Sequence, residues 1–364
     1  MDAQTFTRGL HTLGVRKATG VPCGHLAGPW ELFDRSGDLV PAADEGAALS
    51  IASGMELAGT RAVVLCQNSG FGNLINPLTS LVLPYGIPVL VAMSLRGWPD
   101  PASDETQHSV MGAVTSRFLD ALSVPYAVLD PGAGLGPALA AAAAATAERR
   151  PFFLLVPRGS ISGPPGRPEP APPDEAPTRP DVVTALMSLL GDEPLVTTTG
   201  YLSRQVHATA DRPGTFYMQG SMGHAAAIAL GVGDARPGRR VVVLDGDGAF
   251  LMHLGTASTI TDRGTDLVHI VVDNGCYEST GGQPSTSRVL DWASLGTGLG
   301  YRATVLCERR SVLEATFRTV LAAKGPVLCV VRTRTAPGEV APRATASGTP
   351  ISFADRFAKE IRSR

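Results

Sequence analysis

The chain of 364 residues lacks the features that mark disulfide scaffolds, zinc ribbons and nucleic-acid-binding proteins. Its five cysteines are scattered and form no C-x-x-C pair, which suits a reducing compartment and gives no metal-thiolate spacing. A formal net charge of −2 provides no general electrostatic attraction to nucleic acid or to an anionic membrane surface. The length is sufficient for two domains of ordinary size, each with a buried core.

Long apolar segments are also missing. The N-terminal stretch "MDAQTFTRGLHTLGVRKATG" has no apolar signal core, and "PALAAAAAATAERR" is too short and too rich in alanine to span a bilayer. We therefore expect a cytoplasmic protein that binds neither a membrane nor a nucleic acid.

The sequence instead repeats one pattern, in which a short β-branched run ends in Gly, Asn or Asp and an Ala/Leu-rich helical stretch follows. The runs are too uniformly apolar to have a solvated face, which predicts buried strands of parallel sheets and an α/β fold. The predicted strands lie in "RAVVLCQNSG", "IPVLVAMS", "PFFLLVPRG", "EPLVTTTG", "RRVVVLDGDG", "DLVHIVVDN" and "GPVLCVVRT".

A proline-rich segment separates two halves of similar size. The stretch "ISGPPGRPEPAPPDEAPTRP" cannot continue a helix or a central strand, which indicates an extended surface linker. The predicted boundaries are residues 1–163 for the first domain, 164–180 for the linker and 181–364 for the second domain. Each half has the strand, glycine-rich turn and helix that bind phosphorylated ligands at the strand ends of an open parallel sheet.

Two strands of the second half end in oxygen ligands, in Gly246-Asp247-Gly248 and in Asp273-Asn274-Gly275. A right-handed crossover places the ends of both strands at the same sheet edge, so Asp247 and Asn274 should converge. A carboxylate and an amide oxygen suit Mg²⁺, which completes its shell with water and phosphate oxygens. Taken separately, each tripeptide is also ordinary turn chemistry.

At these residues the sequence resembles the thiamine diphosphate-dependent enzymes, whose signature is G-D-G, a helix and a strand ending in Asn. Here the strand ends in "DN", where many members have "NN". The resemblance implies that Mg²⁺ is held by Asp247, Asn274 and the main-chain carbonyl of Cys276. It further implies that Gly246, Gly248 and Ala249 face the diphosphate, at a helix N-terminus.

Further segments extend the resemblance across nearly the whole chain. "FYMQGSMGHAAAIALG" is similar to the segment that grips the aminopyrimidine, with the Gly220 carbonyl and Ser221 beside it and Met222 as an apolar wedge. Core packing is the alternative role for Met222. "TTTGYLSRQ" would bring Gly200 and Tyr201 near the diphosphate.

The first half resembles the family's pyrimidine-binding domain, in which a glutamate before an Ala-rich helix exchanges a proton with the pyrimidine ring. That glutamate is Glu45, and "SGFGNLINPL" follows at the family's spacing. The alternative is that Glu45 only complements the helix dipole. The resemblance thus implies two thiamin-diphosphate-binding-fold domains, each an open, mainly parallel sheet flanked by helices, with no middle domain.

Four segments most resemble the short family members that decarboxylate 3-phosphonopyruvate to phosphonoacetaldehyde and CO₂, and next the members that act on sulfopyruvate. These segments are "TGVPCGHL", "LRGWPDPASDETQH", "GSMGHA" and "DNGCYESTGGQ". Phosphonate natural-product biosynthesis is the family-based expectation for the pathway. A phosphonate needs cationic or strong donor groups at one end of the pocket. The candidate substrate-binding residues are His25, Arg96, Gln107, His108, His224, Glu278, Ser279, Thr280 and Gln283. His108 is also a candidate for proton transfer. His253 and His269 are expected to be structural, and Arg204 remains open.

The resemblance also implies assembly, because family members hold the two ends of the cofactor with domains of different subunits. We expect a homodimer or homotetramer with active sites between subunits and a small 2-oxo acid as substrate. Three other functions stay open: a sulfopyruvate decarboxylase, a carboligase or acetolactate-type transferase, and a non-catalytic Mg²⁺-nucleotide-binding module. The missing middle domain disfavours the second and Glu45 disfavours the third.

Overall fold

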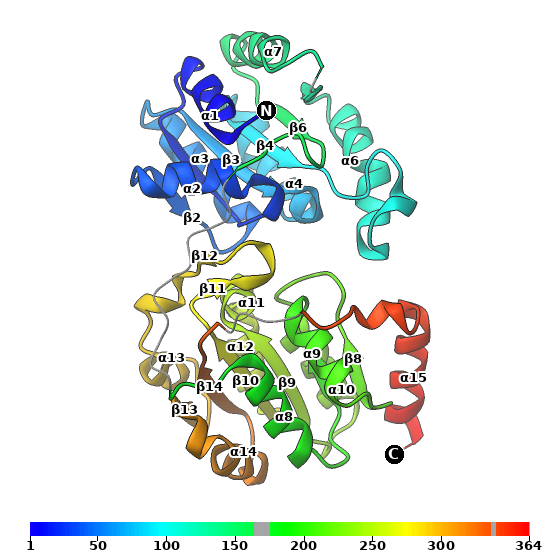
Figure 1. Ribbon diagram of the computed structural model, residues 1–364. Coiled ribbons are helices and arrows are strands. Elements are labelled where there is room, and N and C mark those ends of the chain that lie inside the picture. Colours follow the sequence, from blue (N-terminus) through cyan, green and yellow to red (C-terminus); the bar gives the residue numbers. More distant parts are fainter. Residues whose placement is uncertain (131, 164–174, 336–339, 364) are drawn as a thin grey trace. The chain divides into compact units, whose positions relative to one another are not determined.

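The computed structural model describes residues 1–130, 132–163, 175–335 and 340–363, and it contains two compact units (Figure 1). The N-terminal unit comprises Met1–Arg167 and Thr280–Gln283, and the C-terminal unit comprises Pro168–Ser279 and Pro284–Arg364. Residues 164–174 of the predicted linker lie outside the described residues. Helix α8 (Arg179–Leu189) begins within the last two residues of the predicted linker, with Pro180 in its first turn.

The N-terminal unit is built on a six-stranded sheet in which every adjacent pair of strands is parallel. In spatial order the strands are β2 (Leu39–Pro41), β1 (Lys17–Gly20), β3 (Ala62–Gln67), β4 (Leu90–Ser94), β6 (Phe152–Val156) and β5 (Tyr126–Val128). The helices are α1 (Ala3–Thr12), α2 (Ala27–Arg35), α3 (Glu45–Leu57), α4 (Phe71–Pro77), α5 (Leu83–Tyr85), α6 (Ser109–Ala121) and α7 (Gly136–Ala147).

Alternation along the strands gives this sheet two buried faces. Val64 belongs to a core that includes Leu49 of α3 and Leu74 of α4. Its neighbour Val63 points the other way, into a core that includes Phe6 of α1. Helices therefore cover both faces, and only the ends of the strands remain for polar side chains.

The C-terminal unit repeats this plan, again with every adjacent pair parallel. The strand order is β13 (Ala303–Cys307), β14 (Val327–Arg332), β10 (Leu267–Asp273), β9 (Val241–Gly246), β7 (Leu195–Thr197) and β8 (Thr215–Tyr217). The helices after α8 are α9 (Tyr201–Thr209), α10 (Ala225–Ala235), α11 (Asp247–Met252), α12 (Gly255–Arg263), α13 (Trp292–Gly298), α14 (Leu313–Ala322) and α15 (Pro350–Ser363). Two short strands, β11 (Cys276–Tyr277) and β12 (Gln283–Pro284), pair separately.

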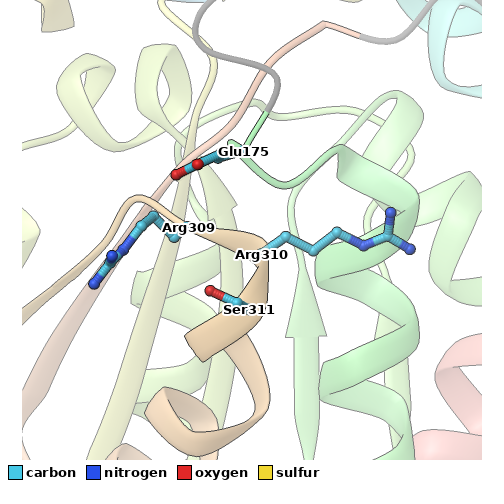
Figure 2. Close-up of a pocket in the computed structure, with 4 residues that line it drawn as sticks. All are labelled: Glu175, Arg309, Arg310 and Ser311. Carbon is cyan, nitrogen blue, oxygen red and sulfur yellow. The ribbon is translucent and has the colours of Figure 1, made fainter.

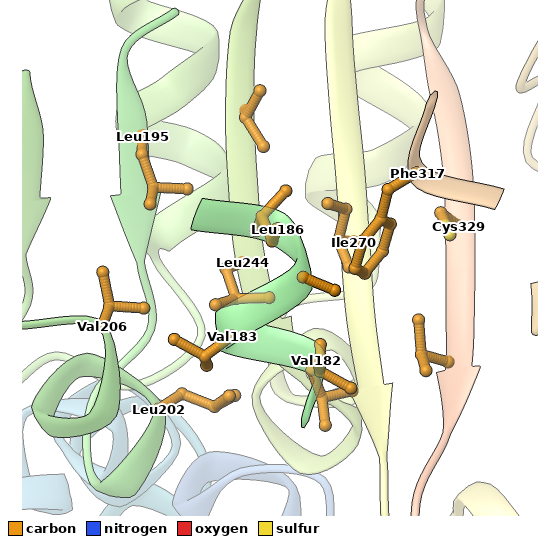
Figure 3. Close-up of a cluster of buried hydrophobic side chains, with 14 of the residues drawn as sticks. Val182, Val183, Leu186, Leu195, Leu202, Val206, Leu244, Ile270, Phe317 and Cys329 are labelled. Carbon is orange, nitrogen blue, oxygen red and sulfur yellow. The ribbon is translucent and has the colours of Figure 1, made fainter. Parts of the chain in front are cut away.

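One core of this unit lies between the sheet and helices α8, α9 and α14 (Figure 3). Leu186 of α8 packs there with Leu244 of β9 and Ile270 of β10, and all three side chains are fully buried. Alternate residues of β9, such as Val243, face a second core with α10 and α15. Because all the strands of this sheet are parallel, their C-terminal ends lie along one edge, here called the strand-end edge.

The fold confirms the predicted architecture of two mainly parallel sheets flanked by helices, and each of the seven predicted strands is present. No middle domain intervenes in the part of the chain that the structure describes. Among the described residues, no helix is both long enough and apolar enough to cross a membrane.

Candidate active site

Asp247 and Asp273 start from neighbouring positions at the strand-end edge of the C-terminal unit. In the parallel pair β9 and β10, Gly246 lies opposite Val272, so the next residue of each strand leaves the sheet at the same level. Asp247 begins α11 and is 3% exposed, and Asp273 ends β10 and is 4% exposed. Two carboxyl groups are thus buried side by side.

Hydroxyl groups connect these carboxyls. Ser285 Oγ donates to Asp247 Oδ2, and Ser287 Oγ lies 2.9 Å from the same oxygen and 2.7 Å from Asp273 Oδ1. The indole Nε1 of Trp292 donates to Asp273 Oδ2 at 2.8 Å. These contacts fix both carboxyl groups in place, although the two serines and Trp292 were not predicted as site residues.

Burial, and secondarily the negative charge of Asp273, together raise the pKa of Asp247 to about 7, although the two serine donors oppose the shift. Within the described residues, neither carboxyl forms an ion pair with lysine, arginine or histidine. Two buried carboxyls without a cation, together with hard oxygen donors, are what a divalent cation such as Mg²⁺ stabilises. The residues present therefore fit this metal.

The other predicted ligands lie on the turn that follows β10. Asn274 Oδ1 accepts a hydrogen bond from the Cys276 main-chain nitrogen at 3.1 Å, and its Nδ2 lies 3.5 Å from Glu278 Oε2. One lone pair of Asn274 Oδ1 stays available, because an amide oxygen accepts two hydrogen bonds. The roles of Asn274 and of the Cys276 carbonyl stay predictions.

The predicted diphosphate residues adjoin this turn. A Cβ atom on Gly248 would lie 2.6 Å from the Tyr277 ring, so only glycine lets the first turn of α11 approach this side chain. Ala249 is buried in the same turn. The main-chain N–H groups at the start of a helix suit the binding of an anionic group, in line with the predicted diphosphate contact.

Two guanidinium groups lie close to the ring of Tyr201 in the same unit. The Cζ atoms of Arg179 and Arg204 lie 5.1 and 5.5 Å from the centroid of its ring. Arg179 also pairs with Glu278. Gly200, with φ of +81°, precedes Tyr201, and a Cβ atom there would lie 3.3 Å from Ser279 Oγ. The structure thus gathers these predicted residues, and it adds Arg179, which the sequence did not single out.

The predicted pyrimidine segment carries a strained turn and a histidine pair. Ser221 has φ of +59°, which is rare for a residue other than glycine, and its Oγ lies 3.2 Å from His224 Nδ1. The rings of His224 and His253 are in contact, with centroids 4.1 Å apart and ring planes tilted by 48°. Gly220 and Met222 flank Ser221 and are half-buried. His253, expected to be structural, therefore contacts a predicted pocket residue.

In the N-terminal unit, Glu45 begins α3 and is 6% exposed. Asn73 Nδ2 donates to Glu45 Oε2 at 2.8 Å, and burial raises the pKa of the carboxyl. A Cβ atom on Gly70 would lie 2.0 Å from Glu45 Oε1, so the glycine of "SGFGN" makes room for this side chain. The segment "SGFGNLINPL" thus contains both the hydrogen-bond partner of Glu45, Asn73, and the glycine that leaves room for its side chain, Gly70.

His108 and Arg96 lie on the loop after β4. His108 is buried, and its Nδ1 lies 3.1 Å from Ser69 Oγ. Arg96 forms a bidentate pair with Asp104 in which both N–O distances are 2.6 Å, and Glu105 lies 3.5 Å from it. Gln107 Nε2 donates to Glu105 as well. The guanidinium that was predicted to bind substrate is therefore already paired with carboxylates.

The remaining candidates are His25, Thr280 and Gln283, and His269 was expected to be structural. His25 Nδ1 is buried without a hydrogen-bond partner among the described residues, and burial is the main cause that lowers the pKa of this imidazole. Thr280 Oγ1 donates to Gln283 Oε1 at 3.0 Å. His269 lies inside β10 with its Nδ1 3.0 Å from the Tyr301 hydroxyl, in accord with a structural role.

A pocket of about 620 Å³ in the C-terminal unit contains none of the predicted residues (Figure 2). It is lined by Glu175, Arg309, Arg310 and Ser311. Arg310 pairs with Asp181 at 3.1 Å, and in Figure 2 the side chains of Arg309 and Arg310 point away from each other. The two guanidinium groups therefore do not converge on one ligand.

Comparison with known proteins finds relatives along nearly the whole chain. Residues 3–100 match the family described as thiamine pyrophosphate enzyme, N-terminal TPP binding domain, and residues 198–331 match its C-terminal TPP binding domain. The phosphonopyruvate decarboxylase of Streptomyces viridochromogenes is 37% identical over 98% of this chain and 94% of that protein. The enzyme of the same name from Streptomyces hygroscopicus is 36% identical over 98% and 93%. A sulfopyruvate decarboxylase of Methanosarcina acetivorans is 28% identical over 83% and 84%.

Proposed function

Because the chain belongs to the phosphonopyruvate decarboxylase family of thiamine diphosphate-dependent enzymes, we propose that it converts 3-phosphonopyruvate to phosphonoacetaldehyde and CO₂. The chain is a thiamine diphosphate-dependent decarboxylase that acts on a small molecule. The observation that carries the choice of substrate is the extent of the similarity, which covers 98% of this chain and 94% of a phosphonopyruvate decarboxylase. The proposed setting is phosphonate natural-product biosynthesis.

The side chains at the two strand-end edges can be assigned parts in this reaction. Asp247, Asn274 and the Cys276 carbonyl would hold Mg²⁺, and the turn Gly246–Ala249 would bind the diphosphate. When bound, thiamine diphosphate supplies the electron sink that takes up the charge left by departing CO₂. The buried pair Asp247 and Asp273 supports this assignment, because a cation relieves its unfavourable burial.

Glu45 is assigned the proton exchange with the aminopyrimidine ring. Its raised pKa means that the carboxyl holds a proton more readily than an exposed glutamate does. Asn73 holds Oε2, which fixes the direction of the carboxyl group. His108, buried and hydrogen-bonded to Ser69, is the proposed donor of the proton that replaces CO₂ on the substrate carbon.

The proposed assembly is a homodimer or homotetramer with each active site formed by two subunits. This part of the proposal rests on the resemblance, because family members hold the two ends of the cofactor with domains of different subunits. Glu45 and Asp247, which would hold these two ends, belong to different units of the chain.

Comparison of three 2-oxo acids tests the proposed substrate. With thiamine diphosphate and Mg²⁺, kcat/KM for phosphonopyruvate should exceed the values for sulfopyruvate and pyruvate, and one aldehyde should form per CO₂. A higher kcat/KM for sulfopyruvate would make this a sulfopyruvate decarboxylase. Consumption of a second keto acid or aldehyde would make it a carboligase.

A further inference from the structure

Arg96 is the only arginine among the predicted substrate-binding residues, and two carboxylates already face its guanidinium. The Arg96 guanidinium is bidentate to Asp104 and lies 3.5 Å from Glu105, so one positive charge faces two carboxylates. All three side chains are largely buried, with exposures of 19%, 9% and 13%. A phosphonate carries one or two negative charges, and it would be repelled by this cluster of net negative charge.

A second arginine leaves the sheet beside Arg96. Strands β4 and β6 are parallel neighbours, and Ser94 lies opposite Val156. The pairing continues past the strands, where the Leu95 nitrogen donates to the Val156 carbonyl at 2.8 Å. Arg96 and Arg158 each stand two residues beyond this matched pair. The register therefore brings both arginines to the same stretch of the strand-end edge.

Arg158 differs from Arg96 in its partners. It is exposed, and it makes no ion pair with any residue that the structure describes. Burial is the main cause that lowers the pKa of His25, and the positive charges of Arg96 and Arg158 lower it further. His25 Nδ1, in turn, is buried and has no hydrogen-bond partner in the described part of the chain. His25 follows β1 and Arg158 follows β6, which are parallel strands of the same sheet, so an uncommitted guanidinium and an unsatisfied ring nitrogen lie at one edge of it.

We propose that Arg158, together with His25, binds the phosphonate group of the substrate, whereas the Arg96–Asp104 pair holds the loop after β4 in place. The inference rests on the proposed function and names the specificity-determining cation of that site. A guanidinium suits this task because its fork of donors matches two oxygens of a phosphonate. Arg158 acts on the non-reacting end of the substrate, so its contact is equally strong before and during the reaction.

Substitution of Arg158 separates this binding role from catalysis. In Arg158→Gln, KM for phosphonopyruvate should rise roughly tenfold to a hundredfold, the range expected for a lost hydrogen bond to a charged group. The value of kcat should change little, because removing uniform binding raises KM alone. The inhibition constant of phosphonoacetate, an unreactive phosphonate, should rise by the same factor. The KM of Arg158→Lys for phosphonopyruvate should lie between the values for the wild type and for Arg158→Gln.

Arg149→Gln is the matched control, because Arg149 is also exposed but precedes β6 and so lies at the opposite end of the same strand. Its KM should equal that of the wild type. The inference is overturned if Arg158→Gln retains the wild-type KM and phosphonoacetate inhibition, or if both variants lose affinity equally. Failure of the proposed function gives a different result, since the wild-type protein would then not convert phosphonopyruvate at all.

Discussion

Asp247 and Asp273 share a single hydroxyl group, that of Ser287, which lies 2.9 Å from one carboxyl and 2.7 Å from the other. A hydroxyl has one hydrogen and can donate fully to only one of the two at a time. Both carboxyls are buried and stand at the ends of adjacent strands. Ser287 therefore cannot satisfy both buried carboxyls at once, and a divalent cation would supply additional attraction for them.

Replacement of Asp247 tests this account of the metal site. Asp247→Ala removes the proposed anionic metal ligand, so Mg²⁺ should no longer strengthen thiamine diphosphate binding. Titration calorimetry with and without Mg²⁺ measures this effect. An affinity that remains equally dependent on Mg²⁺ would place the metal elsewhere.

The shared hydroxyl should matter for stability as well. Ser287→Ala removes the donor between the carboxyls, and we expect the free energy of unfolding to fall by about 1–3 kcal/mol, the cost of leaving a buried polar group unsatisfied. Addition of Mg²⁺ should recover part of this loss, because the cation binds the folded state. Ser258→Ala, which alters an exposed serine of α12, is the control. Equal losses in both variants would contradict a special role for Ser287.

Glu45 offers a test of proton exchange. In Glu45→Gln the cofactor should still bind, but exchange of its C2 proton for deuterium should slow by roughly 10²–10⁴-fold, the usual contribution of a general acid–base group. Nuclear magnetic resonance of the bound cofactor measures the exchange. A normal rate would assign Glu45 a structural role.

The same variant gives a pH dependence. Burial raises the pKa of Glu45 above 4.5, so the folded state favours the protonated carboxyl. The free energy of unfolding of the cofactor-free wild type should therefore decline as pH rises from the unfolded pKa through the folded pKa. Glu45→Gln does not titrate and should lack this decline, so its advantage in thermal stability should grow with pH. The change should fall between roughly pH 4 and 8. If the difference in free energy of unfolding between Glu45→Gln and the wild type stays constant over this range, the raised pKa is contradicted.

The position of Asp247 could be predicted because it follows a strand whose apolar character is plain in the sequence, whereas Glu45 was identified through the family resemblance. β9 and β10 are fully buried along almost their whole length, and Asp247 comes directly after one of them. Short strands such as β5, which is only half-buried over three residues, carry no such pattern and were not predicted.

The partners of these carboxyls could not be predicted, because only tertiary packing brings them together. Ser285 is 38 positions from Asp247, and Asn73 is 28 positions from Glu45. Arg96 shows the opposite difficulty. Its charge and loop position suggested a substrate contact, but no sequence pattern indicated the bidentate pair with Asp104.

Mixed oligomers test the proposed assembly. If each site takes Glu45 from one subunit and Asp247 from another, a heterodimer of Glu45→Gln and Asp247→Ala chains contains one intact site and one doubly defective site. Purified through two different tags, it should show kcat per dimer close to half that of the wild type. An inactive heterodimer, prepared alongside an active tagged wild type, would mean that each site is built within one chain.

The most direct test of the central claim is to follow phosphonopyruvate by ³¹P nuclear magnetic resonance in the presence of the purified protein. The account predicts that its signal is replaced by that of phosphonoacetaldehyde only when both thiamine diphosphate and Mg²⁺ are present, and that Glu45→Gln nearly abolishes the conversion. An unchanged phosphonopyruvate signal with the fully supplied wild-type protein, or conversion that continues without thiamine diphosphate, would contradict it.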